Sequence, residues 1–265
     1  MKKTMKIGIV GCGAIGHALA QVIIGKQVPG ATLVGVFDTD IKKCKGLKRT
    51  PTLAKLVQLS ELVIEAAGMN SVESIADCVL EYKKHLLVMS VGALLSQPDL
   101  INCFHSKNCH LYFPSGALAG LDALKAAKAG GPIKNVILKT TKPPQGLAGA
   151  PFFKTHHTKP EAIKKATTIF KGTAKQAVTL FPANINVAAA ISLVGIGPDK
   201  TKVEIVADPK ATCNRHALLI ESSVGRIECI TENVPSPNNP KTSYLATTSA
   251  MALLKSVITD ERFGT

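Results

Sequence analysis

Three glycines near the start of the chain have the spacing of a phosphate-binding loop, GxGxxG. An apolar run, Met5–Val10, precedes them, and a stretch with helical periodicity, Ala14–Ile24, follows. In such a loop the first glycine permits a tight turn, the second lets a pyrophosphate approach the backbone, and the third lets the helix pack on the strand. The start of the helix adds amide donors for the phosphates. The residues that we expect to hold a dinucleotide pyrophosphate are therefore Gly11, Gly13, Ala14, Ile15 and Gly16.

A carboxylate follows at the end of a second apolar run, about 20 residues after the glycines. Asp38 comes directly after Thr32–Phe37. At this position a carboxylate accepts hydrogen bonds from the adenosine ribose, and it repels a 2′-phosphate. The pattern predicts NAD as the cofactor, although Lys42 and Lys43 lie close behind and NADP is not excluded.

Two later loops of small residues follow strand-like runs. Ala67 lies at the end of the run Leu62–Ala67, and Ser90 and Gly92 come directly after Leu86–Met89. Loops at the carboxyl ends of parallel strands line the ligand crevice of such sheets. We expect these three residues to border the dinucleotide, and ordinary turns of small residues are the alternative.

A third loop of small residues, Pro114–Asp122, opens a helix. Exposed amides at a helix start suit a carboxylate or the nicotinamide carboxamide. Ala117, Ala119 and Gly120 are small enough to let a cofactor lie against the backbone. A plain hinge between domains explains the composition equally well.

Two asparagines and one histidine in the second half of the chain are candidates for substrate binding. Asn184 and Asn186 precede a helix of small apolar residues; capping explains one of them, and we expect Asn186 to be the N-cap. A bound ligand would explain both. His216 lies at the start of a strand, and an imidazole can act as acid or base near neutral pH. A lone histidine is nevertheless more often structural.

Two other groups of side chains resemble a metal site and a reductase signature, but their spacing does not support either function. The cysteines and histidines of Cys103–His110 match no zinc-binding spacing, so we expect no metal site. The pair His156-His157 with Lys159 resembles part of the dihydrodipicolinate reductase signature. The rest of that signature is absent, and we expect a solvated loop.

Strands and helices alternate up to about residue 120, which is typical of a parallel sheet with crossover helices. Later strands follow one another through short turns, which indicates an open antiparallel or mixed sheet. The strands expected are Met5–Val10, Thr32–Phe37, Leu62–Ala67, Leu86–Met89, His110–Phe113, Asn135–Lys142, Thr201–Ala207, His216–Ser222 and Gly225–Glu232. The helices expected are Ala14–Ile24, Ser71–Tyr82, Gln97–Ser106, Glu161–Phe170, Val187–Val194 and a last one, capped by Thr242, that ends near Thr259.

Composition places the chain among ordinary packed proteins. It has 265 residues, of which 46% are hydrophobic and 19% charged, and no apolar run reaches the roughly 18 residues of a membrane span. The start of the chain does not read as a signal peptide, so we expect a cytoplasmic protein with reduced thiols. The net charge is +14, but the lysines are scattered and aromatic residues make up only 4%. We expect a solvated basic surface, or attraction of small anionic substrates, with no nucleic-acid or membrane partner.

Taken together, these segments resemble the L-aspartate dehydrogenase family over nearly the whole chain. The glycine motif is the least specific of them. The segments are GCGAIG (11–16), SVGAL (90–94), PSGALAGLDALKAA (114–127), the long block 170–209, NRH (214–216) and PSPNNPKTSYLATTSAMALL (235–254).

The resemblance implies a doubly wound Rossmann domain and a second α+β domain with an open mixed sheet. The boundaries that we expect are 1–119 for the dinucleotide-binding domain, with 236–265 packing back on it, and 120–235 for the substrate and oligomerisation domain. The family's catalytic histidine corresponds to His216, its asparagine near the nicotinamide to Asn186, and its small-residue loop to 117–120. A homodimer is the tendency of the family.

The implied reaction is NAD(P)-dependent oxidation of L-aspartate to iminosuccinate, which hydrolyses to oxaloacetate and ammonia or feeds NAD biosynthesis through quinolinate. His216 would exchange the amine proton or activate water on the imine. Helix amides, a nearby lysine, Asn184 and Thr242 are candidates for binding the substrate carboxylates, besides Asn186. The alternatives are a dihydrodipicolinate-reductase-like enzyme that acts on another imine or carbonyl, and a non-catalytic dinucleotide sensor.

Overall fold

The computed structural model describes residues 4–182, 185–236 and 239–259. The chain divides into two compact units. Among the described residues, one unit consists of those up to Pro114 together with 247–259, and the other unit is Ser115–Ala246. The use of 120–235 as a substrate and oligomerisation domain stays a prediction.

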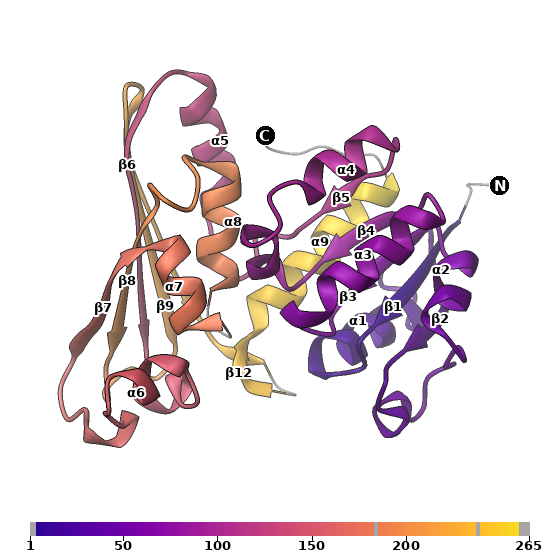
Figure 1. Cartoon of the computed structure of the whole chain (residues 1–265), viewed down its shortest axis with the longest axis horizontal. Helices are drawn as coiled ribbons and strands as arrows, with labels where there is room; N and C mark the ends of the chain where they lie inside the picture. Colours follow the sequence, from indigo (N-terminus) through magenta and orange to yellow (C-terminus); the bar gives the residue numbers. More distant parts are fainter. Residues whose placement is uncertain (1–3, 183–184, 237–238, 260–265) are drawn as a thin grey trace. The chain divides into compact units, whose positions relative to one another are not determined.

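The first unit contains a five-stranded parallel sheet with the strand order β2-β1-β3-β4-β5 (Figure 1). This confirms the expected doubly wound sheet. The order reverses between β1 and β3, and ligands of such sheets bind at the carboxyl ends of the strands at that point. The strands are β1 (Met5–Val10), β2 (Ala31–Phe37), β3 (Leu62–Glu65), β4 (His85–Val88) and β5 (Leu111–Tyr112).

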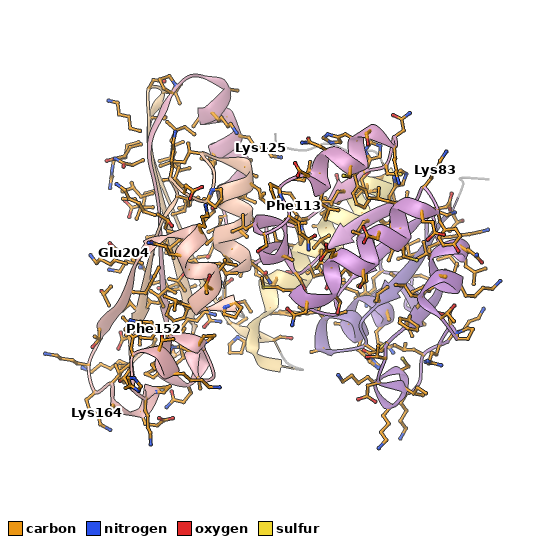
Figure 2. The ribbon with its side chains drawn as sticks, in the orientation of Figure 1. Lys83, Phe113, Lys125, Phe152, Lys164 and Glu204 are labelled. Carbon is orange, nitrogen blue, oxygen red and sulfur yellow. The ribbon has the colours of Figure 1, made fainter. Side chains whose placement is uncertain are left out.

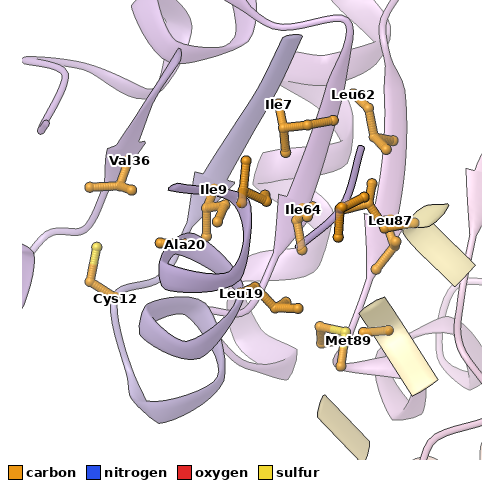
Figure 3. Packing of buried hydrophobic residues seen from close by; sticks show 14 of the residues in the cluster. Ile7, Ile9, Cys12, Leu19, Ala20, Val36, Leu62, Ile64, Leu87 and Met89 are labelled. Carbon is orange, nitrogen blue, oxygen red and sulfur yellow. The ribbon is translucent and has the colours of Figure 1, made fainter. Parts of the chain in front are cut away.

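Helices cover both faces of this sheet because its strands are apolar on both sides. On one face Ile7 and Ile9 of β1 pack with Leu19 of α1 and Leu254 of α9 in a buried cluster. Figure 3 shows Ile7 and Ile9 of β1 and Leu19 of α1 among the buried side chains of this cluster. On the other face α2 contacts β1 and β2, and α3 contacts β3 and β4. The helices are α1 (Ala14–Ile24), α2 (Leu53–Leu59), α3 (Val72–Glu81), α4 (Leu100–Ser106) and α9 (Tyr244–Thr259).

The second unit contains a five-stranded mixed sheet with the order β10-β9-β6-β8-β7. The β6–β8 pair is parallel, and the neighbours on either side pair antiparallel. The open mixed sheet expected for this half is thereby confirmed. The strands are β6 (Ile133–Lys142), β7 (Thr167–Thr173), β8 (Lys202–Ala207), β9 (Asn214–Ser222) and β10 (Gly225–Asn233).

One face of this second sheet is covered by α5, α7 and α8 (Figure 1). Glu204 points to the opposite face, as Figure 2 shows, so its neighbour Ile205 points to the covered face, where it is buried. Thr140 lies opposite Ile205 on one side and opposite His216 on the other, so all three share the covered face. The helices of this unit are α5 (Leu121–Ala129), α6 (Pro151–Thr155), α7 (Ala174–Leu180) and α8 (Asn186–Val194).

Short elements connect these parts. A small antiparallel pair, β11 (Pro235–Ser236) and β12 (Asn239–Ser243), precedes α9. The 3₁₀ turns are Ile41–Cys44, Met69–Ser71, Val91–Leu95, Pro144–Leu147 and Pro160–Ala162. None of the helices in the described ranges combines the length and the apolar character needed to cross a bilayer.

The helix expected at Glu161–Phe170 is wrong, because strand β7 (Thr167–Thr173) occupies its second half. Threonine, isoleucine and phenylalanine there suit a pleated surface better than a helix. Helix α7, which the sequence analysis missed, begins directly afterwards. Thr173 and Gln176 form a capping box in which each side chain accepts a hydrogen bond from the other residue's amide.

Candidate active site

The three glycines of the loop after β1 meet three different surroundings. Gly11 has a φ of +95°, and a Cβ there would collide with the backbone of Ala66. A Cβ on Gly16 would collide with the Gly11 carbonyl oxygen. A Cβ on Gly13 would meet nothing within 4 Å. Gly11 and Gly16 are therefore required by the fold, whereas Gly13 borders open space, which is where a pyrophosphate would lie.

Asp38 fixes the loop to the end of β2. One carboxylate oxygen accepts a 2.7 Å hydrogen bond from the Cys12 amide, and the other accepts a 2.9 Å bond from the Asp40 amide. A cavity of about 260 Å³ opens beside it. The residues that line this cavity include Gly11, Gly13, Asp38 and Ala67, all predicted to bind the cofactor, together with Phe37, Lys43 and Ile75. The cavity lies where the adenosine half of a dinucleotide would bind. Of the cofactor residues predicted in the first unit, Ala14, Ile15, Gly16, Ser90 and Gly92 do not line it.

A buried carboxylate that the sequence analysis missed holds two of the predicted loops. Glu65 ends β3, is fully buried, and accepts hydrogen bonds of 2.8–2.9 Å from the Ala67 and Gly68 amides and from the amide and hydroxyl of Ser90. It thereby joins the loops after β3 and β4. An acidic residue at the end of an apolar strand was the signal that could have found it.

Replacing Glu65 by glutamine tests this link. An amide presents one acceptor oxygen where the carboxylate presents two, so at least one of the four donors faces an NH₂ group. Leaving a buried donor unsatisfied costs about 1–3 kcal/mol. We expect the free energy of unfolding of Glu65→Gln to fall by that amount, and the Kd of NAD to rise. Chemical denaturation and NAD titration measure the two effects, and an unchanged protein by both measures would refute the role.

The second group of predicted residues gathers on the covered face of the mixed sheet. His216 is only 2% exposed, and its Nδ1 lies 3.0 Å from the Thr140 hydroxyl. Burial, and after it the positive charge of Lys142, lower the pKa of His216 to about 3. The imidazole is therefore neutral at neutral pH, and the burial and nearby charge that keep it neutral also weaken it as a base.

The small-residue loop before α5 is attached to the same face. The Ala117 carbonyl accepts 3.0 Å hydrogen bonds from the Thr231 hydroxyl and the Asn233 amide group. Thr231 lies directly opposite His216 in the β9–β10 ladder. Gly120 has a φ of +93°, and a Cβ there would lie 2.7 Å from the sulfur of Cys229 on β10. The structure thus places Ala117, Gly120 and His216 on one side of one sheet, and Ala119 is exposed beside them.

The structure supports less of what was predicted for the remaining substrate residues. Asn186 is exposed and is the first residue of α8, with Ile185 as the N-cap, so the expected cap at Asn186 is wrong. Asn184 lies outside the described residues. Thr242 does not cap α9, which begins at Tyr244, because β12 continues to Ser243. The side chain of Thr242 lies outside the described part of the chain.

The structure also describes the groups that the sequence analysis set aside. His156 and His157 are exposed, and the His156 ring stacks on Phe152 with 4.0 Å between ring centroids. In the described ranges no group of three or more His, Cys, Asp or Glu side chains is arranged to hold a metal ion. Cys12 is buried against Cys44. Burial is the main reason that the pKa of its thiol is raised to about 12, so the thiol stays protonated and unreactive.

These features define a two-domain NAD(P)-dependent dehydrogenase. One unit has a parallel sheet with a GxGxxG loop and an acidic residue at the end of β2. The other has a mixed sheet with a buried histidine. Residues 11–114 match the family model of the homoserine dehydrogenase NAD-binding domain, and residues 122–257 match that of the aspartate dehydrogenase C-terminal domain. The chain belongs to the aspartate dehydrogenase family.

Similar proteins cover the chain from end to end. The L-aspartate dehydrogenase of Methanosarcina acetivorans is 42% identical over 272 residues, which cover 98% of this chain and 100% of the relative. That of Nitrosopumilus maritimus is 42% identical over 97% of both chains. The crystal structure of aspartate dehydrogenase from Thermotoga maritima has a TM-score of 0.76 at 28% identity and covers 98% of this chain and 99% of its own. A hyperthermophilic archaeal homoserine dehydrogenase in complex with NADPH shares the fold, with a TM-score of 0.62 at 12% identity over 99% of this chain and 100% of its own.

Proposed function

We propose that the protein oxidises L-aspartate to iminosuccinate with NAD(P)⁺ as the hydride acceptor. The observation that carries the proposal is the buried, neutral His216 next to the Ala117 loop, in a chain whose residues 122–257 match the aspartate dehydrogenase C-terminal domain. Iminosuccinate then hydrolyses to oxaloacetate and ammonia, or is consumed on the route through quinolinate to NAD.

His216 serves as the proton acceptor in this mechanism. The substrate amine has to be neutral before hydride can leave the α-carbon, because only a free lone pair can form the imine. The neutral imidazole has a ring nitrogen free for the ammonium proton, and Thr140 at Nδ1 leaves Nε2 as the atom that we assign to the exchange. The negative charge of a bound dicarboxylate would raise the proton affinity of the ring, which burial and the charge of Lys142 lower. Bound NAD(P)⁺ supplies the hydride acceptor, whose C4 must come within about 3–3.5 Å of the α-carbon.

The cofactor is bound by the glycine loop and Asp38. Asp38 has both carboxylate oxygens directed at loop amides, and its negative charge disfavours a 2′-phosphate. Lys43 lines the same cavity and can partly neutralise such a phosphate. We infer a preference for NAD with measurable use of NADP. We also infer that Ser90, Gly92, Ala117, Ala119, Gly120 and Asn186 lie along the nicotinamide half, and that the protein is a cytoplasmic homodimer.

A steady-state assay tests the proposal. The protein is supplied with L-aspartate and NAD⁺ or NADP⁺, and in the reverse direction with oxaloacetate, ammonia and NADH, and absorbance at 340 nm is followed. We expect turnover in both directions and a higher kcat/KM with NAD⁺. Turnover only of a cyclic imine would favour a dihydrodipicolinate-reductase-like enzyme. Binding of NAD⁺ without turnover of any amino acid would favour a sensor.

A further inference from the structure

An arginine beside the end of β2 carries a buried nitrogen that nothing satisfies. Within the described ranges, the Nε of Arg49 is the one buried side-chain nitrogen or oxygen without a hydrogen-bond partner. Arg49 also takes part in none of the ion pairs found there. A buried donor without an acceptor is costly, and more so in a charged group. The side chain therefore gains free energy if it meets an anionic acceptor.

The backbone brings Arg49 to the edge of the parallel sheet. Residues 48–50 run parallel to β2, which is an outermost strand of the sheet. The Val36 amide donates to the Lys48 carbonyl at 2.9 Å, and the Thr50 amide donates to the Val36 carbonyl at 2.8 Å. Arg49 is thereby the lateral partner of Val36, which lies two residues before Asp38.

Two observations place the guanidinium next to the adenosine cavity. Its Cζ lies 5.9 Å from the ring centroid of Phe37, which lines that cavity. Burial foremost, and then Cys44 and Asp38, raise the pKa of the Cys12 thiol, and the positive charge of Arg49 opposes them. Arg49 is therefore close to Cys12, whose amide binds the Asp38 carboxylate. Arg49 is half-buried and is not itself a lining residue, so it has to turn past Phe37 to reach a ligand.

We propose that Arg49 is a specificity-determining residue for the cofactor, whose guanidinium binds the 2′-phosphate that distinguishes NADP from NAD. The inference rests on the proposed function, which assigns the adenosine half of the cofactor to this cavity. The Asp38 carboxylate repels such a phosphate, and a nearby arginine offsets the repulsion. A guanidinium presents its donors as a fork that matches two phosphate oxygens, so the phosphate would supply the acceptor that Nε lacks. Lys43 on the cavity wall offers only a point charge.

Two nucleotide fragments isolate the contribution of the 2′-phosphate. 5′-ADP and 2′,5′-ADP differ in that group alone, and calorimetry measures the Kd of each for the full chain. Arg49→Met removes the guanidinium, and Lys48→Met removes the exposed charge next to it as a matched control. We expect Arg49→Met to raise the Kd of 2′,5′-ADP about tenfold, the usual loss of a hydrogen bond to a charged group, and to leave that of 5′-ADP unchanged. Lys48→Met should leave both Kd values within about twofold of the wild type.

Thermal unfolding separates recognition from a structural role. Arg49→Met removes a buried donor that had no partner, so we expect its unfolding midpoint not to fall. Arg49→Lys keeps the charge and loses the fork, and its Kd for 2′,5′-ADP should lie between those of the wild type and Arg49→Met.

Three results would overturn the assignment. Equal weakening of both fragments in Arg49→Met would mean that the guanidinium binds the adenine or the ribose, which both fragments share. An unchanged Kd for 2′,5′-ADP with a lower unfolding midpoint would make Arg49 structural. Weaker binding of 2′,5′-ADP in Lys43→Met but not in Arg49→Met would assign the phosphate to Lys43. Neither fragment reacts, so a protein that does not turn over L-aspartate, and thereby refutes the proposed function, still gives a separate answer for Arg49.

Discussion

Replacing His216 by alanine is expected to lower kcat for L-aspartate by a factor of about 10²–10⁴, the usual contribution of a positioned acid or base. The ring is buried, neutral and hydrogen-bonded to Thr140, so its loss removes the group that takes up the amine proton. The Kd of NAD⁺ should stay the same, because the glycine loop and Asp38 lie in the other compact unit. Steady-state kinetics and NAD⁺ titration measure the two quantities.

A matched control is available in His156, which is exposed and stacks on Phe152. We expect His156→Ala to keep kcat within about twofold, since surface substitutions usually have small effects. If His216→Ala retained wild-type kcat while remaining folded, the role of His216 would be structural, as a lone buried histidine often is. A lowered thermal midpoint with unchanged kcat would point the same way.

The second large effect is expected in the glycine loop, where two neighbouring glycines should respond in opposite ways. Gly11→Ala forces a side chain into a left-handed conformation, at a cost of about 1–3 kcal/mol, and drives its Cβ into the Ala66 backbone. We expect a clear loss in the free energy of unfolding. Gly13 has a φ of −72°, and a Cβ there meets nothing within 4 Å. Gly13→Ala should therefore fold normally and bind NAD⁺ at least tenfold more weakly.

Denaturation curves and NAD⁺ titrations of both variants distinguish a ligand-binding loop from a plain turn. If the loop were a turn without a ligand, Gly13→Ala would change neither the denaturation curve nor the NAD⁺ titration. Wild-type affinity for NAD⁺ in Gly13→Ala would contradict the placement of the pyrophosphate against this residue.

The first unit was largely predictable because its signals are local. β1 and α1 are confirmed at the residues expected, since an apolar run and a 3.6-residue period lie within a few residues of each other. The strand β7 was missed because its short sequence, TTIFKGT, is too brief for a clear period of two or of 3.6 residues.

The site was predictable only where its residues form a motif. The position of Glu65 at the end of an apolar strand is visible in the sequence, but its role depends on donors up to 25 residues away in the chain, which no local pattern identifies. Lys142 is separated by more than 70 residues from His216, and only the strand register brings the two onto one face. The roles of Asn186, Asn184 and Thr242 stay predictions.

The most direct test of the account follows the hydrogen that leaves the substrate. L-aspartate carrying deuterium at the α-carbon is incubated with the protein and NAD⁺, and the NADH formed is examined by mass spectrometry and NMR. We predict one deuterium at C4 of the nicotinamide in each NADH, together with slower turnover than with unlabelled substrate. NADH without deuterium would contradict hydride transfer from the α-carbon of a dicarboxylic amino acid.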